Sequence, residues 1–227
     1  FYMCTSLKSV IGMGGVTSIG GGAFYGAFGG CTSLVAVSIP TSVTSIGVQT
    51  FNGCTLLKSV SGMGGVTSIG ISAFYGCTSL TAVTIKPSVT SIGENAFYKC
   101  AALKSVLGME GVTRIDQNAF KDCWSLKSVT FPTRSLTTIG PTAFLGSGLA
   151  KVTLYYGTLG KKSPAKNVNF FGVIVEIIII GRPPQTLRRM IFNAIDKGRP
   201  LGAHHHPNTS PCANGGAACA RAVQRRT

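Results

Sequence analysis

The chain has 227 residues, of which 44% are apolar and only 12% are charged, and 30 are glycine. This composition excludes a chain that is disordered over most of its length, and the irregular spacing of the glycines excludes a collagen-like fibre. The formal charge of +15 is uneven: residues 1–157 hold ten Lys and Arg against four carboxylates (net +6), and residues 158–227 hold eleven against two (net +9). A pI near 9.8 therefore reflects mainly the last third and does not predict specific nucleic-acid binding.

A 23-residue repeat dominates residues 1–157. Cysteines recur at this spacing after a four-residue insertion in the first interval, and Leu, Val, Ile and Phe recur at fixed distances from them. The six cysteines are Cys4, Cys31, Cys54, Cys77, Cys100 and Cys123, and Ser147 replaces them in a seventh, degenerate copy. The pattern begins within a copy, because residues 1–4 match residues 97–100, so we expect the natural chain to start further upstream.

Alternate copies differ in one segment, which defines a 46-residue unit. Odd copies read Lys-Ser-Val-x-Gly-Met, as at 58–63. Even copies read Val-x-Ile-Pro or a close variant, as at 37–40. This alternation indicates the duplication of a two-copy unit.

Each copy contains three local patterns. Leu-x-x-Val-x-Ile alternates apolar and polar residues and predicts a half-buried strand, and Val-Thr-Ser-Ile-Gly predicts a second short strand with a glycine turn. Ala-Phe-x-x-Cys predicts a short helical or 3₁₀ turn with Phe and Cys on one side. One copy cannot bury its apolar side alone, so six to seven stacked copies are predicted to form a mainly β solenoid about 30 Å long.

The clearest copy, at 80–100, resembles the BspA-like class of leucine-rich repeat. Its pattern is Leu-x-x-Val-x-Ile-Pro-x-x-Val-Thr-Ser-Ile-Gly-x-x-Ala-Phe-x-x-Cys, and the resemblance covers about residues 1–157. It implies a solenoid with a concave parallel sheet from the first strand and a second, short sheet. It further implies a surface or secreted protein involved in adhesion or recognition, without catalytic residues.

The repeated cysteines are interpreted as buried thiols, because Phe and Leu of the repeat flank each of them. Disulfide bridges between adjacent copies, such as Cys77 and Cys100, are the alternative. The chain has no Cys-x-x-Cys pair, and the repeats contain no histidine, so we predict no metal site.

Lysine follows the repeat Leu in four copies, and a fifth lysine lies near the same place in the last copy. These residues are Lys8, Lys58, Lys104, Lys127 and Lys151. We predict that they line one edge of the first sheet and bind an acidic protein or glycan. The alternative is that they keep the solenoid soluble and protect its strands against aggregation.

Small polar residues occupy the remaining exposed positions. The outward positions of the first strand carry mainly Ser, Thr and Ala, which predicts a flat face that is either merely solvated or a weak, broad binding surface. A threonine column runs along the second strand at Thr17, Thr44, Thr67, Thr90 and Thr113. Organisation of surface water is a minor alternative for this column.

The repeat pattern ends near residue 157, and we predict an unrelated C-terminal tail at 158–227. The apolar run 173–180 predicts a strand and is too short to cross a bilayer. We expect a helix at 185–197 that caps the solenoid, and disorder at 199–227. The alternative is that this tail is not a functional segment.

No catalytic group set is present in the repeats, which hold no histidine and four scattered carboxylates. We therefore predict a non-catalytic protein- or glycan-binding or adhesion scaffold of the cell-surface or extracellular type, without a cofactor. We predict no specific nucleic-acid partner and no transmembrane segment. The alternative is a purely structural, surface-organising repeat protein without a specific ligand.

Overall fold

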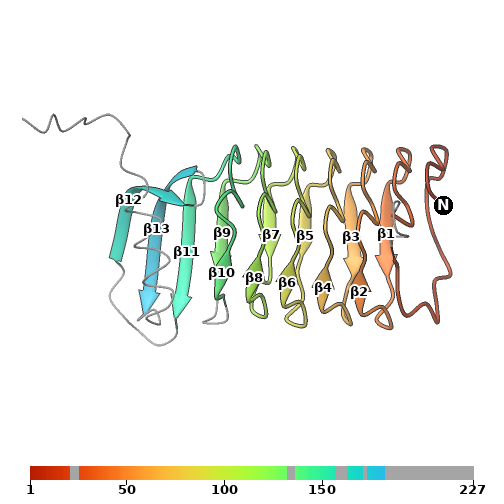
Figure 1. Cartoon of the computed structure of the whole chain (residues 1–227), viewed down its shortest axis with the longest axis horizontal. Helices are drawn as coiled ribbons and strands as arrows, with labels where there is room; N and C mark the ends of the chain where they lie inside the picture. The colour runs from red at the N-terminus through yellow and green to blue at the C-terminus, as the bar shows by residue number, and fades with distance from the viewer. Residues whose placement is uncertain (21–25, 132–135, 157–162, 171–172, 182–227) are drawn as a thin grey trace, which may run out of the picture.

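The computed structural model describes residues 1–20, 26–131, 136–156, 163–170 and 173–181. Its turns stack side by side along the long axis of the molecule (Figure 1). Five consecutive turns each supply a strand to two different sides of the stack, which confirms the mainly β solenoid. An earlier copy joins them through isolated bridges at Ser9 and Ile19.

The first strands of successive turns run parallel on one side of the solenoid (Figure 1). They are β1 (Ala36–Ile39), β3 (Ser59–Gly62), β5 (Ala82–Thr84), β7 (Ser105–Leu107), β9 (Ser128–Phe131) and β11 (Lys151–Tyr156). In β5 the central Val83 is buried while Ala82 and Thr84 are exposed. This alternation places one side of each strand in the core, as the period of two predicts.

The second strands form a continuous five-stranded parallel sheet in the order β10-β8-β6-β4-β2. They are β2 (Ser45–Ile46), β4 (Ser68–Ile69), β6 (Ser91–Ile92), β8 (Arg114–Ile115) and β10 (Thr138–Ile139). Their isoleucines pair in register and are buried. Each strand contributes only two residues, because the chain turns directly after the isoleucine, at a glycine in four of the strands and at Asp116 after β8.

The first sheet shows why the sequence alternates between two kinds of copy. Its hydrogen-bonded pairs are β1–β3, β5–β7 and β9–β11. Gly62, at the end of β3, has a φ of +84°, and the following Met63 enters the core with 1% exposure. In even copies Ile39 and Ile85 already fill this part of the core. A left-handed glycine therefore moves the core residue one position later, as in a β-bulge.

The structure corrects the prediction of helical or 3₁₀ turns at Ala-Phe-x-x-Cys. Among the described residues these segments are hydrogen-bonded turns, and no helix occurs. Gln49 and Gly53 have φ values of +55° and +72°, and left-handed residues interrupt a right-handed helix. Between them the amide of Phe51 donates to the carbonyl of Ala73 at 2.7 Å. These amides thus bond to the next turn instead of to a helical partner.

A column of phenylalanine rings forms the centre of the core. Rings of adjacent turns stack with centroids 5.2–5.4 Å apart and planes within 11° of parallel. The column comprises Phe1, Phe28, Phe51, Phe74, Phe97, Phe120 and Phe144. The repeat Leu, Cys and Val pack in the same cluster, so a single core runs through all turns.

The segment after the repeats adds strands to the first sheet. β13 (Val173–Gly181) pairs parallel with β11, and β12 (Ser163–Phe170) pairs antiparallel with β13. The first sheet therefore continues beyond the last recognisable copy, although this segment lacks the repeat pattern. The predicted helix at 185–197 and the predicted disorder at 199–227 lie outside the described residues.

We expect Gly62→Ala to destabilise the solenoid. An added Cβ at Gly62 would lie 1.9 Å from the carbonyl oxygen of Ile39, and φ is left-handed there. The combined strain should lower the free energy of unfolding by about 2 kcal/mol or more. Urea unfolding followed by circular dichroism measures this change.

Gly14→Ala is the matched control, because an added Cβ there meets nothing within 4 Å and φ is not left-handed. It should shift the unfolding midpoint little. Equal shifts for the two variants would contradict this explanation of the alternating copies.

Candidate binding surface

Four of the predicted lysines form one column along the start of the first strands. The column consists of Lys8, Lys58, Lys104 and Lys127, and we call it the lysine column. All four side chains are exposed. The amide of Lys58 donates to the Val35 carbonyl and that of Lys104 to the Thr81 carbonyl, both at 2.8 Å. Backbone bonds between turns thus keep equivalent positions aligned, with Val35 and Thr81 in the intervening turns.

Lys151 lies one residue beyond the lysine column. It is exposed and pairs with Ser128 of β9, while Ala150 donates its amide to the Lys127 carbonyl at 2.9 Å. The last copy has one residue fewer between Ser147 and its repeat Leu, so Ala150 takes the lysine position. The last copy therefore places its lysine on the strand itself.

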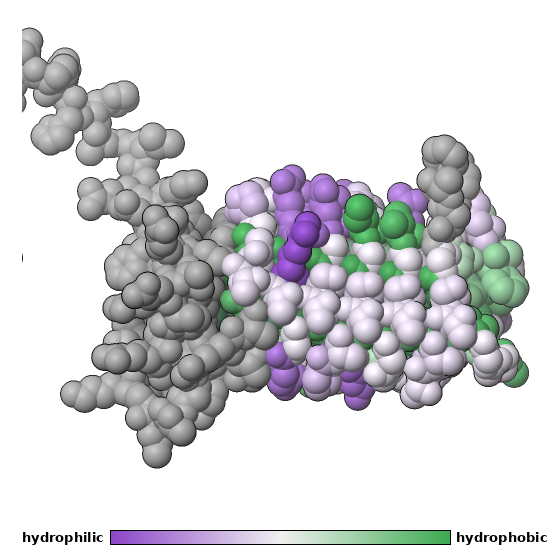
Figure 2. All heavy atoms as spheres, turned by 60° about the horizontal axis from the view of Figure 1, so that its bottom comes forward, coloured by the Kyte–Doolittle hydropathy of each residue, from purple (hydrophilic) through white to green (hydrophobic). Residues whose placement is uncertain are grey.

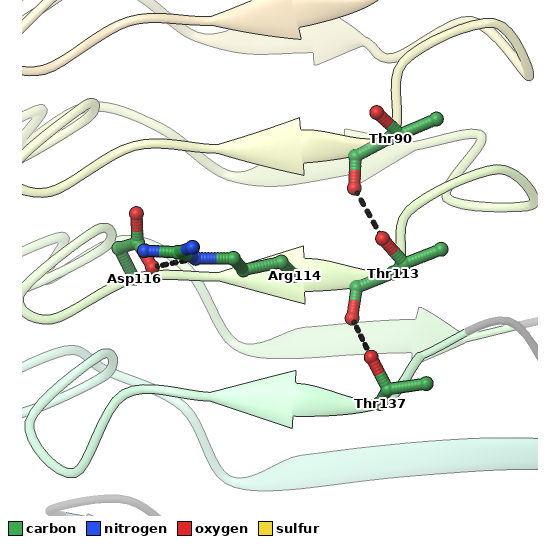
Figure 3. Close-up of polar contacts among 5 residues, drawn as sticks. All are labelled: Thr90, Thr113, Arg114, Asp116 and Thr137. Atoms are coloured by element: carbon green, nitrogen blue, oxygen red, sulfur yellow. Dashed lines mark hydrogen bonds and ion pairs between the residues drawn. The ribbon is translucent and has the colours of Figure 1, made fainter.

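No carboxylate among the described residues lies within ion-pair distance of the lysine column. The other charged side chains have different neighbours. Arg114 pairs with Asp116 beside the second sheet (Figure 3). Lys99 and Lys121 each place Nζ 5.3 Å from the centroid of the Tyr98 ring. Among the described residues, no ion pair or side-chain hydrogen bond engages the ammonium groups of Lys8, Lys58 and Lys104, whereas that of Lys127 bonds to the Trp124 carbonyl.

The outward face of the first sheet is flat and only weakly polar, as predicted. A shallow depression of about 230 Å³ is lined by Ser105, Leu107, Ser128 and Thr130, among others. Leu107 is 57% exposed, and Ile11 of the first copy is 91% exposed at the equivalent position, where the second, third, fourth and sixth copies have Ser or Thr. This depression is smaller than the pockets of roughly 300–1,000 Å³ that usually hold small molecules, so it does not define a small-molecule site.

The threonine column is part of the stacking between turns. The hydroxyl of Thr113 donates to the carbonyl of Thr90 at 3.0 Å, and that of Thr137 donates to the carbonyl of Thr113 at 2.9 Å (Figure 3). Thr67 and Thr90 make the same bond to the turn before them. In the coloured part of Figure 2 a band of pale, weakly polar side chains runs along the molecule, with hydrophilic and hydrophobic side chains beside it. These hydroxyl groups therefore stabilise the stacking of the turns.

Trp124 is a candidate that the sequence reasoning did not identify. Its side chain is 63% exposed, although the equivalent position in other copies holds Thr or Ala. The flanking turns present only Ala101 and Gly148 at this position, so small residues border the ring on both sides. Lys127 Nζ donates to the Trp124 carbonyl at 3.2 Å, which joins Trp124 to the lysine column. Its departure from the repeat consensus is the signal that marks it.

The repeated cysteines are buried thiols, as predicted. Cys31, Cys54, Cys77, Cys100 and Cys123 are free and fully buried, whereas Cys4 is exposed. Each buried Sγ donates to the carbonyl oxygen of the aligned phenylalanine in the preceding turn, at 3.0–3.1 Å. The described residues contain no group of three His, Cys, Asp or Glu able to hold a metal ion.

Burial changes the acid–base properties of these thiols. Desolvation raises the pKa of Cys54 from 9.0 to about 12, and the charge of neighbouring Cys31 contributes in the same direction. The pKa of Cys77 and that of Cys100 are raised well above 9.0, chiefly by burial. The thiols therefore stay protonated in the folded chain at neutral pH and do not act as nucleophiles.

We expect the solenoid to lose stability at alkaline pH because of these thiols. Since their folded pKa exceeds the unfolded value of 9.0, the unfolded chain releases protons first as pH rises. The thiol contribution is complete below pH 9.0 and is lost between 9.0 and about 12. Unfolding midpoints measured in urea across this range should fall steeply.

The control is a double variant, Cys77→Ser and Cys100→Ser, because Ser147 shows that the seventh copy uses serine at this position. Its stability should decline less steeply with pH than that of the parent chain, whatever its stability at neutral pH. Identical pH slopes would contradict the assignment.

Parallel stacked turns with an aligned Leu, Val, Ile, Phe and Cys core define a leucine-rich-repeat solenoid. The family model for the BspA type leucine rich repeat region matches residues 25–151 in six copies, which is more than half of the chain. The chain therefore belongs to the BspA-type leucine-rich-repeat family. None of the curated proteins matches it.

The chain is similar to several solved structures. The chain is 23% identical to the pneumococcal vaccine antigen PcpA, with a TM-score of 0.51 over 61% of this chain and 36% of that one. A T. pallidum leucine rich repeat protein, TpLRR, is 29% identical over 79% of this chain and 77% of that one, with a TM-score of 0.48. A leucine rich cell surface protein of Faecalibacterium prausnitzii is 26% identical over 77% of this chain and 54% of that one, with a TM-score of 0.46.

Two of these proteins are much longer than the aligned part. The chain spans about a third of PcpA and about half of the Faecalibacterium protein. In the part of this chain that the structure describes, no helix is long and apolar enough to cross a membrane.

Proposed function

We propose that this chain is a non-catalytic scaffold that binds an acidic protein or glycan at the cell surface or outside the cell. The lysine column carries the proposal: four exposed ammonium groups share one edge, and no described carboxylate pairs with them. Such an array raises the local concentration of an anionic partner and orients it along the solenoid. Lys151 extends the positive charge onto the first strand of the last copy.

Membership of this family supports a non-catalytic role, since the repeated residues of the family stabilise the stacking of turns and include no catalytic residues. Aligned backbone bonds fix the positions of the column without any bound group. A broad, flat, weakly polar face beside it suits an extended partner better than a small substrate. The surface or secreted location is part of this proposal, and the family to which the chain belongs supports it.

A purely structural role is the second candidate, because many polar side chains already serve the stack. The Thr67, Thr90 and Thr113 hydroxyls bond to the preceding turn, and Ser88 donates its hydroxyl to the carbonyl of Val66 at 2.7 Å. In this role the lysines would only prevent strand-to-strand aggregation. Self-association without a specific ligand is then the expected behaviour.

Charge reversal in the column distinguishes the two roles. We expect the triple variant Lys58→Glu, Lys104→Glu and Lys127→Glu to weaken binding to an acidic partner about tenfold or more, because attraction becomes repulsion at the contact. The full chain is tested against arrayed matrix proteins, acidic and neutral glycans, and nucleic acid, at low and high salt.

The matched control reverses three lysines elsewhere, Lys86→Glu, Lys99→Glu and Lys121→Glu, which changes the net charge equally. It should retain most of the binding. Equal losses in both variants, or binding to every polyanion that vanishes at high salt, would remove the lysine column as a site and favour the structural role.

A further inference from the structure

Three members of the lysine column have a regular spacing that net charge alone does not explain, and the fourth, Lys127, lies in the turn directly after Lys104. Lys8, Lys58 and Lys104 occupy every second turn, and the turns between them present Val35 and Thr81. Because neighbouring strands are about 4.8 Å apart, these lysines recur about every 10 Å along the axis. The spacing follows from the two-copy unit up to Lys104, since the odd copies carry Lys-Ser-Val and the second and fourth copies do not, whereas the sixth copy also carries it at 127–129.

An exposed aromatic side chain lies at one end of this series. Trp124 shares its turn with Lys127, whose ammonium group bonds to the Trp124 carbonyl. Its indole is 63% exposed, and the neighbouring turns place only Ala101 and Gly148 beside it. A flat ring left open in this way offers a stacking surface, and tryptophan is enriched among the residues that contribute most to binding.

We propose that the column binds a linear acidic polysaccharide that carries one carboxylate or sulfate in each disaccharide. The polymer lies parallel to the solenoid axis, its anionic groups meet Lys8, Lys58 and Lys104, and one sugar ring stacks on Trp124. This inference rests on the proposed binding function and names its ligand class. The uncharged Val35 and Thr81 lie opposite the neutral sugars between the anionic groups.

Other polyanions fit this arrangement less well. Phosphates along one strand of a duplex recur about every 3.4 Å, much closer than every second turn of the solenoid. An acidic peptide would gain most by pairing with a free strand edge. Here the strands β1 and β3 already bond to each other, as do β5 and β7, and the sugar-type stacking surface at Trp124 would go unused.

Trp124 is the only tryptophan of the chain, so its fluorescence reports directly on the site. The full chain is titrated with hyaluronan oligosaccharides long enough to span the solenoid, which carry one carboxylate per disaccharide. The comparison ligands are neutral dextran, polygalacturonate with a carboxylate on every sugar, and single-stranded DNA. We expect a saturable blue shift and quenching with hyaluronan, and tighter binding of hyaluronan than of the other three.

Two variants separate the parts of the site, with affinity measured by calorimetry. Trp124→Thr introduces the residue that four other copies have at this position and should weaken hyaluronan binding about tenfold. The double variant Lys58→Thr and Thr81→Lys keeps the net charge but moves one lysine by a single turn. It should weaken hyaluronan binding by a similar factor, because one anionic group loses its partner.

The results that would overturn the polysaccharide inference differ from those that would overturn the proposed binding function. Unchanged affinity in the charge-neutral double variant, an unresponsive Trp124, or equal binding of DNA and polygalacturonate would each overturn the spacing rule. If hyaluronan does not bind while an arrayed acidic protein still does, the polysaccharide inference fails and the binding function stands. If nothing binds through the lysine column, both fail.

Discussion

Backbone hydrogen bonds between turns are the interaction on which the rest of this structure depends. On the second-sheet side the amide of Thr90 donates backwards to the Thr67 carbonyl at 2.8 Å. On the phenylalanine side the amide of Phe74 donates forwards to the Ala96 carbonyl at 2.8 Å. Residues 22 or 23 positions apart must therefore stay opposite one another, since a shifted turn would leave buried amides without partners. This constraint keeps the repeat length fixed and aligns equivalent side chains into columns.

Columns of identical residues follow from that alignment, both inside and outside. In the interior, the stacked phenylalanine rings and the thiol bonds to phenylalanine carbonyls require the same residue in each turn. On the exterior, any residue type that recurs becomes a line of side chains at strand spacing. Lysines at one repeat position, in alternate copies up to Lys104 and again at Lys127, thus become a row of positive charge, and a single departure from the repeat such as Trp124 is exposed among small residues. The fold holds equivalent residues at a constant spacing, and the side chains at the exposed positions determine which partner the surface binds.

Much of this was predictable from the sequence, because the signals are repeated. The two strands per copy, the buried cysteines and the alignment of Lys8, Lys58, Lys104 and Lys127 follow from period and spacing alone. The helical turn was a wrong prediction, since left-handed φ at residues such as Gln49 and Ser72 is not visible in a motif that otherwise suits a helix. The position of Lys151 depended on a missing residue in a degenerate copy. Trp124 was not identified from the sequence, because a consensus taken over all copies hides the one copy that differs.

Amide hydrogen exchange on the full chain tests the central claim most directly. The account predicts that amides bonded to a neighbouring turn, such as those of Phe74, Thr90 and Phe97, are strongly protected, with protection recurring every 23 residues and greatest in the middle turns. Amides without an inter-turn partner should exchange faster within the same copy. Protection that does not follow the repeat, or uniformly rapid exchange across the copies, would contradict a solenoid held together by bonds between turns.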